Sequence, residues 1–462
     1  MTDTYRLGAR AIVAGGSLAG LLSARVLADY YDQVVIVERD DIHDEPEDRR
    51  MTPQSRHVHI LLKGGELAIE ELLDGFAEDM ANAGSESVDP GRELLAGGER
   101  GVAPPWNDAP WHWLAQSRAL LEHLVRRRVN AYSDNIQQRF NTTVRGLSYD
   151  AAANRITGVH VESDGADSEH LQADLVIDAT GRGAGAVRWL SALGLPGPFV
   201  EEVKVDFGYT SGVFKLKADR MREWKGAIIG TMPPTARGSL LMPVDGGLHI
   251  CSVGGRFGDF PPDELDGFLE FLKSLPQPMI FEVISDAEPV SDLVTMRYEF
   301  NRFRHYERMD DLPEGLIPIG DAMCSVNPTY GQGMSSAAKQ VLGLKQVIDE
   351  LAPSGASLAE IAKAQLKRGA QIADVPWRQA NFTDFAYPET EGDRSMFSKE
   401  EAAQRMAMQV LSMRDTDLRL KLFKVNQLVE PPSTLFDDPE VMGKVNAWIE
   451  RQAAKAGAKS PL

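Results

Sequence analysis

A glycine-rich turn near the start of the chain constrains its fold more than any other feature. Residues 15–20 read Gly-Gly-Ser-Leu-Ala-Gly, after an apolar run and before a stretch with helical spacing. At such a turn a phosphate can meet the unpaired amides of the helix N-terminus. Gly15 permits the tight turn and Gly20 lets the helix lie close to the strand, while Ser17 stands where a second glycine is usual. The turn predicts a nucleotide-binding unit.

An acidic residue follows at a suitable distance. The apolar strand predicted at 34–37 ends at Glu38, whose carboxylate can accept hydrogen bonds from ribose hydroxyls. With strand, turn, helix and acid in this order, the segment predicts dinucleotide binding. It does not separate NAD from FAD.

A second motif, far along the chain, distinguishes between NAD and FAD. Gly320-Asp321 follows an apolar strand, and residues 327–334 read Asn-Pro-Thr-Tyr-Gly-Gln-Gly-Met. An Asp in this place can accept hydrogen bonds from a ribityl chain, and the Gly-Gln-Gly turn lets backbone approach an aromatic ring. A helix starting near Gly333 would point its positive end toward that ring. A nicotinamide dehydrogenase needs no such site, so the motif favours FAD.

The chain has 462 residues, more than one hydrophobic core usually organises. Its pattern predicts an α/β fold: a Rossmann-like FAD-binding domain in discontinuous pieces, an inserted mixed β-sheet for substrate, and a helical C-terminal section. The predicted boundaries are 1–75, 111–200 and 300–346 for the FAD-binding domain, 76–110 for an excursion or lid, 201–299 for the sheet, and 347–462 for the helical section.

Composition excludes several classes of protein. The net charge of -19 argues against a nucleic-acid-binding surface. The two cysteines, Cys251 and Cys324, form neither a disulfide framework nor a zinc site, and no metal-ligand spacing is present. No apolar run reaches the length of a membrane span and the first residues are not signal-like, so we expect a cytoplasmic enzyme. The charged run 40–50 predicts a solvated loop.

Longer motifs carry a resemblance to a known family. The chain is similar to the para-hydroxybenzoate-hydroxylase-like FAD-dependent monooxygenases, and within them to the branch that includes bacterial polyether epoxidases acting on polyenes. The motifs are ERD (38–40), PQSRHVHILLKGG (53–65), QSRALLEHLVRRR (116–128), DLVIDATGRGAGAVRWL (174–190), GDAMCSVNPTYGQGMSSAA (320–338), WRQANFTDFAYPETEG (377–392) and LVEPPSTLF (428–436).

The resemblance implies a reaction and a set of FAD contacts. It implies that a flavin C4a-hydroperoxide transfers one atom of O2 to a lipophilic substrate, with alkene epoxidation ahead of aromatic hydroxylation. A flavin-dependent reductase of prenyl double bonds and a non-catalytic flavin-binding protein are the rivals. The residues that would contact FAD are Gly15, Ser17, Gly20, Glu38, Arg39, Arg118, Gly320, Asp321, Gly331, Gly333 and Met334.

The inserted sheet is the predicted wall of the substrate pocket, which would include Phe207, Tyr209, Met242 and Pro328. His57 is a candidate catalytic residue, with a structural histidine as the alternative. Lys63 can be compared with the essential lysine of flavin halogenases, but the tryptophan motif of those enzymes is not recognisable, which favours a solvated lysine. Trp106, Trp111 and Trp113 would either close an apolar entrance or anchor the lid.

The source of electrons stays open. Many aromatic hydroxylases of the family carry Asp-Gly where this chain has Thr180-Gly181, and that pair serves both FAD and NADPH binding. The departure leaves two alternatives, reduction by NAD(P)H directly or through a separate flavin reductase.

Overall fold

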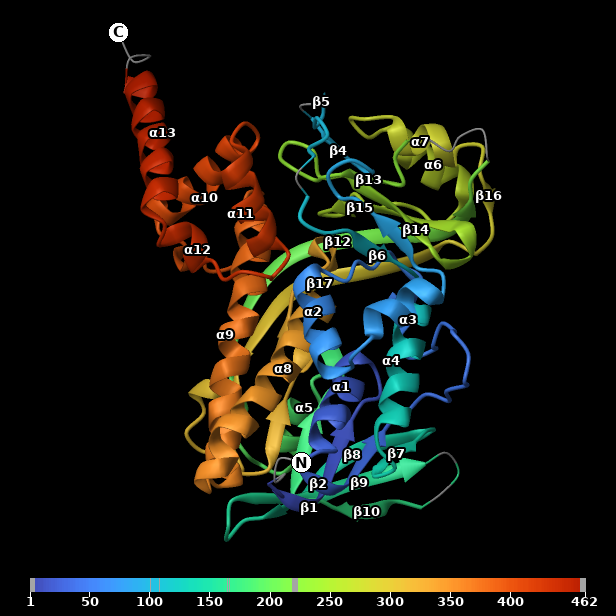
Figure 1. Cartoon of the computed structure of the whole chain (residues 1–462), viewed down its shortest axis with the longest axis vertical. Coiled ribbons are helices and arrows are strands. Elements are labelled where there is room, and N and C mark those ends of the chain that lie inside the picture. The colour runs from blue at the N-terminus through green and yellow to red at the C-terminus, as the bar shows by residue number, and fades with distance from the viewer. Residues whose placement is uncertain are drawn as a thin grey trace.

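The structure is a computed structural model that describes residues 5–99, 101–107, 109–163, 165, 167–217 and 223–457. Figure 1 shows its layers: a parallel sheet with helices in the lower half, a large mixed sheet above it, and a group of C-terminal helices to one side. The long strands β12 (Phe199–Lys215) and β17 (Val294–His305) run from the lower part into the upper part.

The parallel sheet brings distant parts of the chain together. Its strand order is β18-β11-β1-β2-β7, and every neighbouring pair is parallel. The strands β11 and β18 are fully buried and β1 and β2 are largely so, as expected of apolar runs covered on both faces, whereas the edge strand β7 is partly exposed. The α/β fold class is therefore confirmed. The strands are β1 (Gly8–Ala14), β2 (Tyr31–Val37), β7 (Ile136–Arg139), β11 (Leu175–Asp178) and β18 (Leu316–Pro318).

Helices pack on one face of this sheet, and a small antiparallel sheet, β10-β9-β8, lies beside it. The predicted hairpin at 150–154 is confirmed as the β8–β9 connection. These elements are α1 (Leu18–Leu27), α2 (Lys63–Leu72), α3 (Phe76–Asn82), α4 (Arg118–Tyr132), α5 (Gly185–Ala192), α8 (Gly333–Leu351), β8 (Thr142–Asp150), β9 (Arg155–Ser163) and β10 (Glu169–Gln172).

The large sheet runs β19-β17-β12-β15-β14-β13-β4-β5, with β16 also on β12. The hairpin predicted around Asp245-Gly246-Gly247 joins β14 to β15. Part of the 76–110 segment joins this sheet, because β4 pairs with β13. The remaining elements are β3 (Glu86–Val88), β4 (Leu94–Gly98), β5 (Gly101–Val102), β6 (Trp113–Ala115), β13 (Gly226–Ile229), β14 (Gly238–Val244), β15 (Leu248–Arg256), β16 (Glu288–Pro289), β19 (Cys324–Ser325), α6 (Leu265–Lys273) and α7 (Met279–Ile284).

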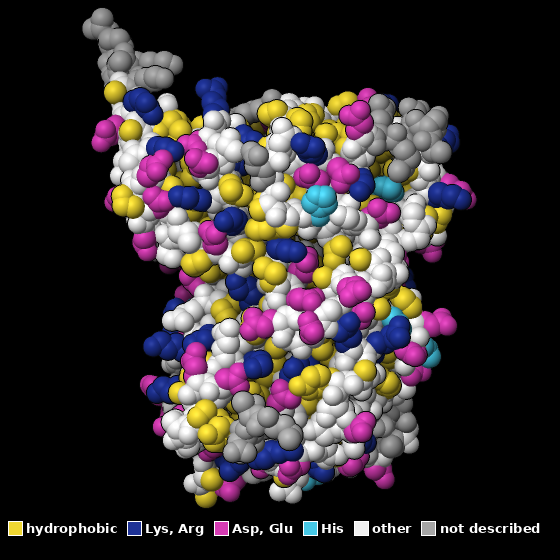
Figure 2. All heavy atoms as spheres, in the orientation of Figure 1, with side chains coloured by type: hydrophobic (Ala, Val, Ile, Leu, Met, Phe, Trp, Pro, Cys, Tyr) yellow, Lys and Arg dark blue, Asp and Glu magenta, His cyan; other side chains and the backbone are white. Residues whose placement is uncertain are grey.

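The C-terminal section is helical, as predicted. The helix α9 packs along α8, and the later helices enclose a small core of their own around Met408, Leu418 and Val445. Among the described helices, none combines the length and the hydropathy needed to cross a membrane. Acidic and basic side chains are intermixed over the face seen in Figure 2. The helices are α9 (Leu358–Asp384), α10 (Lys399–Ser412), α11 (Thr416–Asn426), α12 (Ser433–Phe436) and α13 (Pro439–Gly457).

Candidate active site

A single large cavity connects the two predicted motifs. Its volume is about 760 Å³, and it runs from the glycine-rich turn past Asp321 to the C-terminal helices. A cavity of this size is typical of cofactor and substrate sites. Of the predicted site residues it is lined by Gly15, Ser17, Glu38, Arg39, His57, Arg118, Phe207, Tyr209, Asp321, Pro328, Gly331, Gly333 and Met334.

Two positions of the glycine-rich turn, Gly15 and Gly20, leave no room for a side chain. Gly15 has a φ of +108°, and a Cβ on it would lie 2.5 Å from the carbonyl oxygen of Ala179. A Cβ on Gly20 would lie 1.8 Å from the carbonyl oxygen of Gly15. Gly20 therefore acts beneath the turn, by letting α1 approach β1, and does not face the cavity. The open edge of the turn is left to a ligand.

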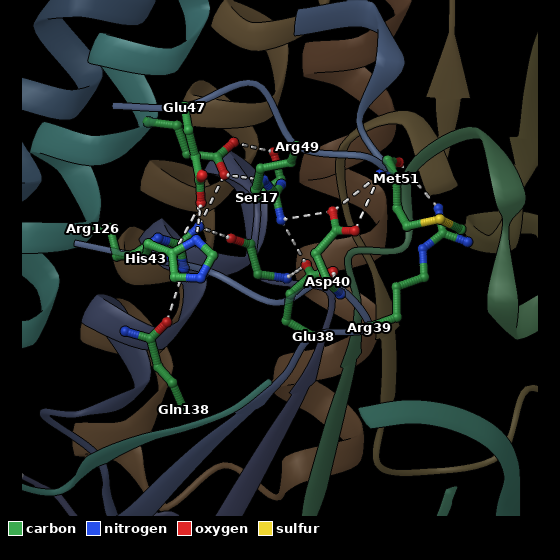
Figure 3. A network of polar contacts seen from close by, with 12 residues as sticks. Ser17, Glu38, Arg39, Asp40, His43, Glu47, Arg49, Met51, Arg126 and Gln138 are labelled. Atoms are coloured by element: carbon green, nitrogen blue, oxygen red, sulfur yellow. Dashed lines mark hydrogen bonds and ion pairs between the residues drawn. The ribbon is translucent and has the colours of Figure 1, made fainter. Parts of the chain in front are cut away.

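Glu38 lies at the end of β2 with its carboxylate held beside the turn. It is buried, and its Oε2 accepts a hydrogen bond from Gly16 N at 2.7 Å while its Oε1 accepts one from Asp40 N at 2.9 Å. Figure 3 shows this carboxylate among the charged groups of the following loop. Its contact with a ribose stays a prediction.

A buried group of arginines surrounds Glu122, on α4. Its carboxylate pairs with Arg118 at 2.6 Å, with Arg49 at 2.8 Å and with Arg126 at 2.9 Å, and it accepts a hydrogen bond from the Ser17 hydroxyl at 2.8 Å. Burial opposes ionisation, but the arginines lower the pKa of Glu122 to about 2. Glu122 is therefore ionised near neutral pH and holds these arginines beside the glycine-rich turn.

The prediction of a solvated loop at 40–50 is wrong for its two ends. Asp40 and Arg49 are both buried, and Arg49 pairs with Glu38 at 3.2 Å as well as with Glu122. The sequence reasoning missed Arg49, because a run of charges does not reveal that a distant glutamate on another helix draws one member inward. Figure 3 shows Arg49 between Ser17 and Asp40.

Arg118 lies at the start of α4, where the Ser117 hydroxyl caps the helix by accepting a hydrogen bond from Leu120 N at 3.1 Å. Arg118 is only 6% exposed and is therefore not a surface arginine. Its Nη2 donates to Ser17 Oγ at 2.8 Å, whereas Nη1 is buried without a hydrogen-bond partner among the described residues. An unsatisfied buried guanidinium nitrogen beside a helix N-terminus fits an anionic ligand.

Asp321 marks the second motif, in the turn after β18. The carboxyl group is half-buried, and burial raises its pKa although Arg182 and Arg304 oppose that shift. Gly320 has a φ of +68° and Gly331 a φ of +64°, so this turn and the later loop both need glycine. A Cβ on Gly333 would lie 3.5 Å from Asp321 Oδ1, which places the start of α8 against the carboxyl group.

The loop 327–333 is fixed by a second buried network. Tyr330 donates its hydroxyl hydrogen to Asp384 Oδ1 at 2.6 Å, and Asp384 pairs with Arg256 at 2.9 Å. Asn327 and Asn301 also donate to Asp384, at 3.3 Å and 2.9 Å. These residues come from the loop, the large sheet and α9, so one buried carboxylate joins three parts of the molecule at the cavity wall.

The wall next to this loop is aromatic and partly polar. Tyr209 stacks on Phe207 with ring centroids 5.6 Å apart and donates its hydroxyl hydrogen to Met296 Sδ at 3.0 Å. His57 packs edge-on against Tyr209 and bonds through Nδ1 to Ser211 Oγ at 2.7 Å. Burial, with smaller effects of His59 and Arg182, lowers the pKa of His57 to about 3, so the ring is neutral.

Met242, predicted to line the substrate pocket, does not line the cavity. It belongs to a packed core with Val88, Trp113 and Ile250, whereas Leu240, on the same face of β14, lines the cavity. The β3 and β6 strands cover that end of the face, so alternation along β14 alone does not tell which residues meet a ligand.

The C-terminal helices form the far wall, through residues that include Leu422, Val425 and Phe436. The predicted tryptophan cluster is joined to this wall: Trp111 stacks on Phe423 at 5.5 Å, and Trp113 donates its indole hydrogen to Gln427 Oε1 at 3.0 Å. Trp106 packs edge-on against the same Phe423, with ring centroids 5.2 Å apart, so the cluster anchors the end of the 76–110 segment to the C-terminal section. Trp113 also lines the cavity.

Lys63 does not line the cavity. It lies at the start of α2 and pairs with Glu66 at 2.5 Å, one turn further along the same helix. The comparison with a halogenase lysine therefore finds no support in this geometry.

Two relatives of known sequence are similar over most of the chain. "Protein Rv3254" of Mycobacterium tuberculosis is 29% identical over 367 residues, which is 77% of this chain and 77% of that protein. Kynurenine 3-monooxygenase of Salinispora arenicola is 25% identical over 422 residues, 88% of this chain and 86% of that enzyme. No family model matches the sequence.

Solved structures agree with the fold. The flavin-dependent brominase Bmp2 superposes with a TM-score of 0.67 and 16% identity, covering 97% of this chain and 100% of that one. The p-nitrophenol 4-monooxygenase PnpA of Pseudomonas putida gives a TM-score of 0.64 at 16% identity, with 92% and 99% covered. The chain has the fold of the FAD-dependent monooxygenases. The chain thus shares its fold with flavin-dependent monooxygenases of known structure and has sequence similarity to kynurenine 3-monooxygenase.

Proposed function

We propose that the protein adds one atom of O2 to a lipophilic small molecule, with alkene epoxidation as the favoured reaction and FAD as the cofactor. The observation that carries the proposal is the cavity itself. It joins the glycine-rich turn, Arg118 with its unpaired nitrogen and the loop 327–333 to an aromatic chamber. This chamber is the part of the cavity lined by Phe207 and Tyr209, under the C-terminal helices.

The residues present fit FAD. Glu38 would hold a ribose, the amides at the start of α1 and the free Nη1 of Arg118 would hold the pyrophosphate, and Asp321 would hold the ribityl chain. The backbone at Gly331 and Gly333 leaves room for the ring system. When bound, FAD supplies the oxygen-transferring chemistry, which side chains alone do not offer.

The protein's own residues orient the substrate and exclude water. Phe207 and Tyr209 present stacked rings to the cavity, and the C-terminal helices close its far side with apolar side chains. Nδ1 of His57 bonds to Ser211 Oγ and the Tyr209 hydroxyl donates to Met296 Sδ, whereas Nε2 of His57 is buried without a hydrogen-bond partner among the described residues. Because burial lowers the pKa of His57 to about 3, its ring is a weak base. We therefore assign His57 to the cavity wall, where it positions Tyr209.

Labelled oxygen gas tests the reaction. FAD-loaded protein, with reductant, is expected to give farnesol epoxide that carries one labelled oxygen atom, measured by mass spectrometry. Naphthol serves as the matched aromatic probe. Ring hydroxylation of naphthol without epoxidation of farnesol would favour an aromatic hydroxylase, the class to which the similar kynurenine 3-monooxygenase belongs. Saturated farnesol formed without oxygen would identify a reductase, and product lacking the label would overturn the proposal.

Replacing Arg118 tests the assignment of the pyrophosphate site. We expect Arg118→Met to raise the FAD dissociation constant by about 10- to 100-fold, the usual value of a charge-assisted hydrogen bond. Quenching of flavin fluorescence during titration measures this. The matched control is Arg127→Met, because Arg127 is exposed on the same helix. Equal affinities of the two variants would remove Arg118 from the site.

The electron donor is proposed to be a separate flavin reductase. Thr180 is used within its own turn: its hydroxyl donates to Asp178 Oδ1 at 2.6 Å and accepts from Gly185 N at 2.8 Å. Asp178 is buried and also accepts from Ala186 N at 2.6 Å. We expect NADPH alone, without oxygen, to leave the visible flavin absorption of the loaded protein unchanged for minutes, whereas an added flavin reductase bleaches it. Rapid bleaching by NADPH alone would contradict this.

A further inference from the structure

Arg182 stands out among the residues that line the cavity. It lies on the short turn Gly181–Gly183, between β11 and α5, at the same edge of the parallel sheet as the glycine-rich turn and Asp321. From there it reaches across to the large sheet, where it meets side chains of β17. Its side chain is exposed within this region, unlike the buried arginines around Glu122.

The contacts of Arg182 leave its charge uncompensated. Its guanidinium donates to Met296 Sδ at 3.7 Å and lies 5.4 Å from the ring centroid of Tyr298, and within the described part of the chain these are its partners. A thioether and an aromatic face are weak acceptors that position a cation without neutralising it. Arg405, also on the cavity wall, differs because Glu401 pairs with it at 2.8 Å.

The effects of Arg182 on neighbouring groups show that its positive charge lies beside the aromatic chamber. The field of Arg182 acts on His57 and Tyr209, and it opposes the effect of burial on the pKa of Asp321. Asp321 is not ion-paired with it and is needed for the ribityl chain in the proposed FAD site. His57 is neutral and therefore adds no positive charge beside Arg182. The rest of the chamber wall offers Phe207, Tyr209 and Tyr298.

We propose that Arg182 binds an anionic group of the substrate, so that the enzyme takes lipophilic carboxylic acids or their phosphate analogues. This deepens the proposed function and rests on it. The planar guanidinium can bind a carboxylate through parallel hydrogen bonds, while Met296 and Tyr298 hold it from the other side. The apolar wall formed by the C-terminal helices would receive the chain of the acid.

Binding of probes that share one tail and differ in charge tests this. Decanoate, decanol and decyltrimethylammonium are titrated into the FAD-loaded protein by isothermal calorimetry near neutral pH. We expect decanoate to bind at least about tenfold more tightly than decanol, as for a charge-assisted hydrogen bond, and the cation most weakly. The preference should vanish in Arg182→Gln and persist in part in Arg182→Lys.

The control is Arg302→Gln, because Arg302 is on the same strand as Met296 but pairs with Glu202 at the surface at 2.6 Å. It should keep the full preference, and flavin absorption shows that each variant holds FAD. The proposal fails if decanoate shows no binding or no preference, or if the preference survives in Arg182→Gln. It also fails if Arg182→Gln weakens only NADPH binding, since the anion would then be a cofactor phosphate. Labelled farnesol epoxide without any charge preference would sustain the proposed function and reject Arg182. A charge preference with no labelled product from farnesol or from its carboxylic acid, farnesoic acid, would instead reject the oxygenase.

Discussion

Glu122→Gln is expected to lower the free energy of unfolding by about 3–5 kcal/mol, the usual cost of removing one partner of a buried ion pair. The amide keeps the size of the side chain and can still bond to Ser17, but it leaves Arg49, Arg118 and Arg126 buried together without their shared anion. Urea unfolding of the FAD-free protein measures the loss. Added FAD should recover part of it, because its pyrophosphate would bring negative charge to Arg118.

The pH dependence of stability tests independently how much the Glu122 carboxylate contributes to the free energy of unfolding. Its pKa is lowered from 4.5 to about 2 in the folded protein, so its contribution is complete above the unfolded value and is lost as the pH falls through the folded one. Wild type should therefore lose stability between about pH 4.5 and pH 2 more steeply than Glu122→Gln.

A surface pair provides the control for that experiment. Glu162 pairs with Arg145 at 2.6 Å, and its side chain is 47% exposed. Glu162→Gln should change the free energy of unfolding by less than about 1 kcal/mol. Equal effects of the two substitutions, or parallel pH profiles for wild type and Glu122→Gln, would show that Glu122 does not hold the arginines as the structure indicates.

The local motifs were predictable because short stretches of sequence encode them. The turn at 15–20 and the Gly320-Asp321 motif each combine a buried strand with a glycine that backbone geometry requires, and Glu38 directly follows a buried strand. The structure brings all three to one edge of one sheet. The hairpin at Asp245-Gly246-Gly247 is local in the same sense. Patterns of this kind need no knowledge of distant partners.

The partners of some charged residues, such as Arg49, were not predictable, because their ion pairs join groups that lie far apart in the sequence. Ser17 and Glu122 are 105 residues apart, and only the folded protein shows that Glu122 draws Arg49 out of its charged loop. Arg182 shows the opposite case: its motif was visible in the sequence, but only the fold shows that no described carboxylate pairs with it. The same limit applies to Met242, since β14 alternates as expected while the paired strands β3 and β6 decide which of its residues faces the cavity.

Asp384→Asn is expected to destabilise the protein by about 3–5 kcal/mol and to weaken FAD binding as well. Both Asp384 and Arg256 have side chains with 0% exposure, and their ion pair spans 2.9 Å. An asparagine fills the same space and still accepts a hydrogen bond from Tyr330, so the loss isolates the missing charge opposite a buried guanidinium. The effect on FAD follows because Asp384 also fixes Asn327 and Tyr330, which frame the loop beside Asp321.

Tyr330→Phe separates the charge from the hydrogen bond. It removes the 2.6 Å bond to Asp384 but leaves the ion pair with Arg256 intact, so its cost should be nearer to about 1 kcal/mol. Urea unfolding and FAD titration of both variants give the comparison, and a double-mutant cycle of Asp384→Asn with Arg256→Met measures their coupling. If Asp384→Asn costs no more than Tyr330→Phe, the ion pair does not join the sheet, the loop and α9. A large coupling would instead make this carboxylate the link through which the C-terminal section holds the flavin-facing loop in place.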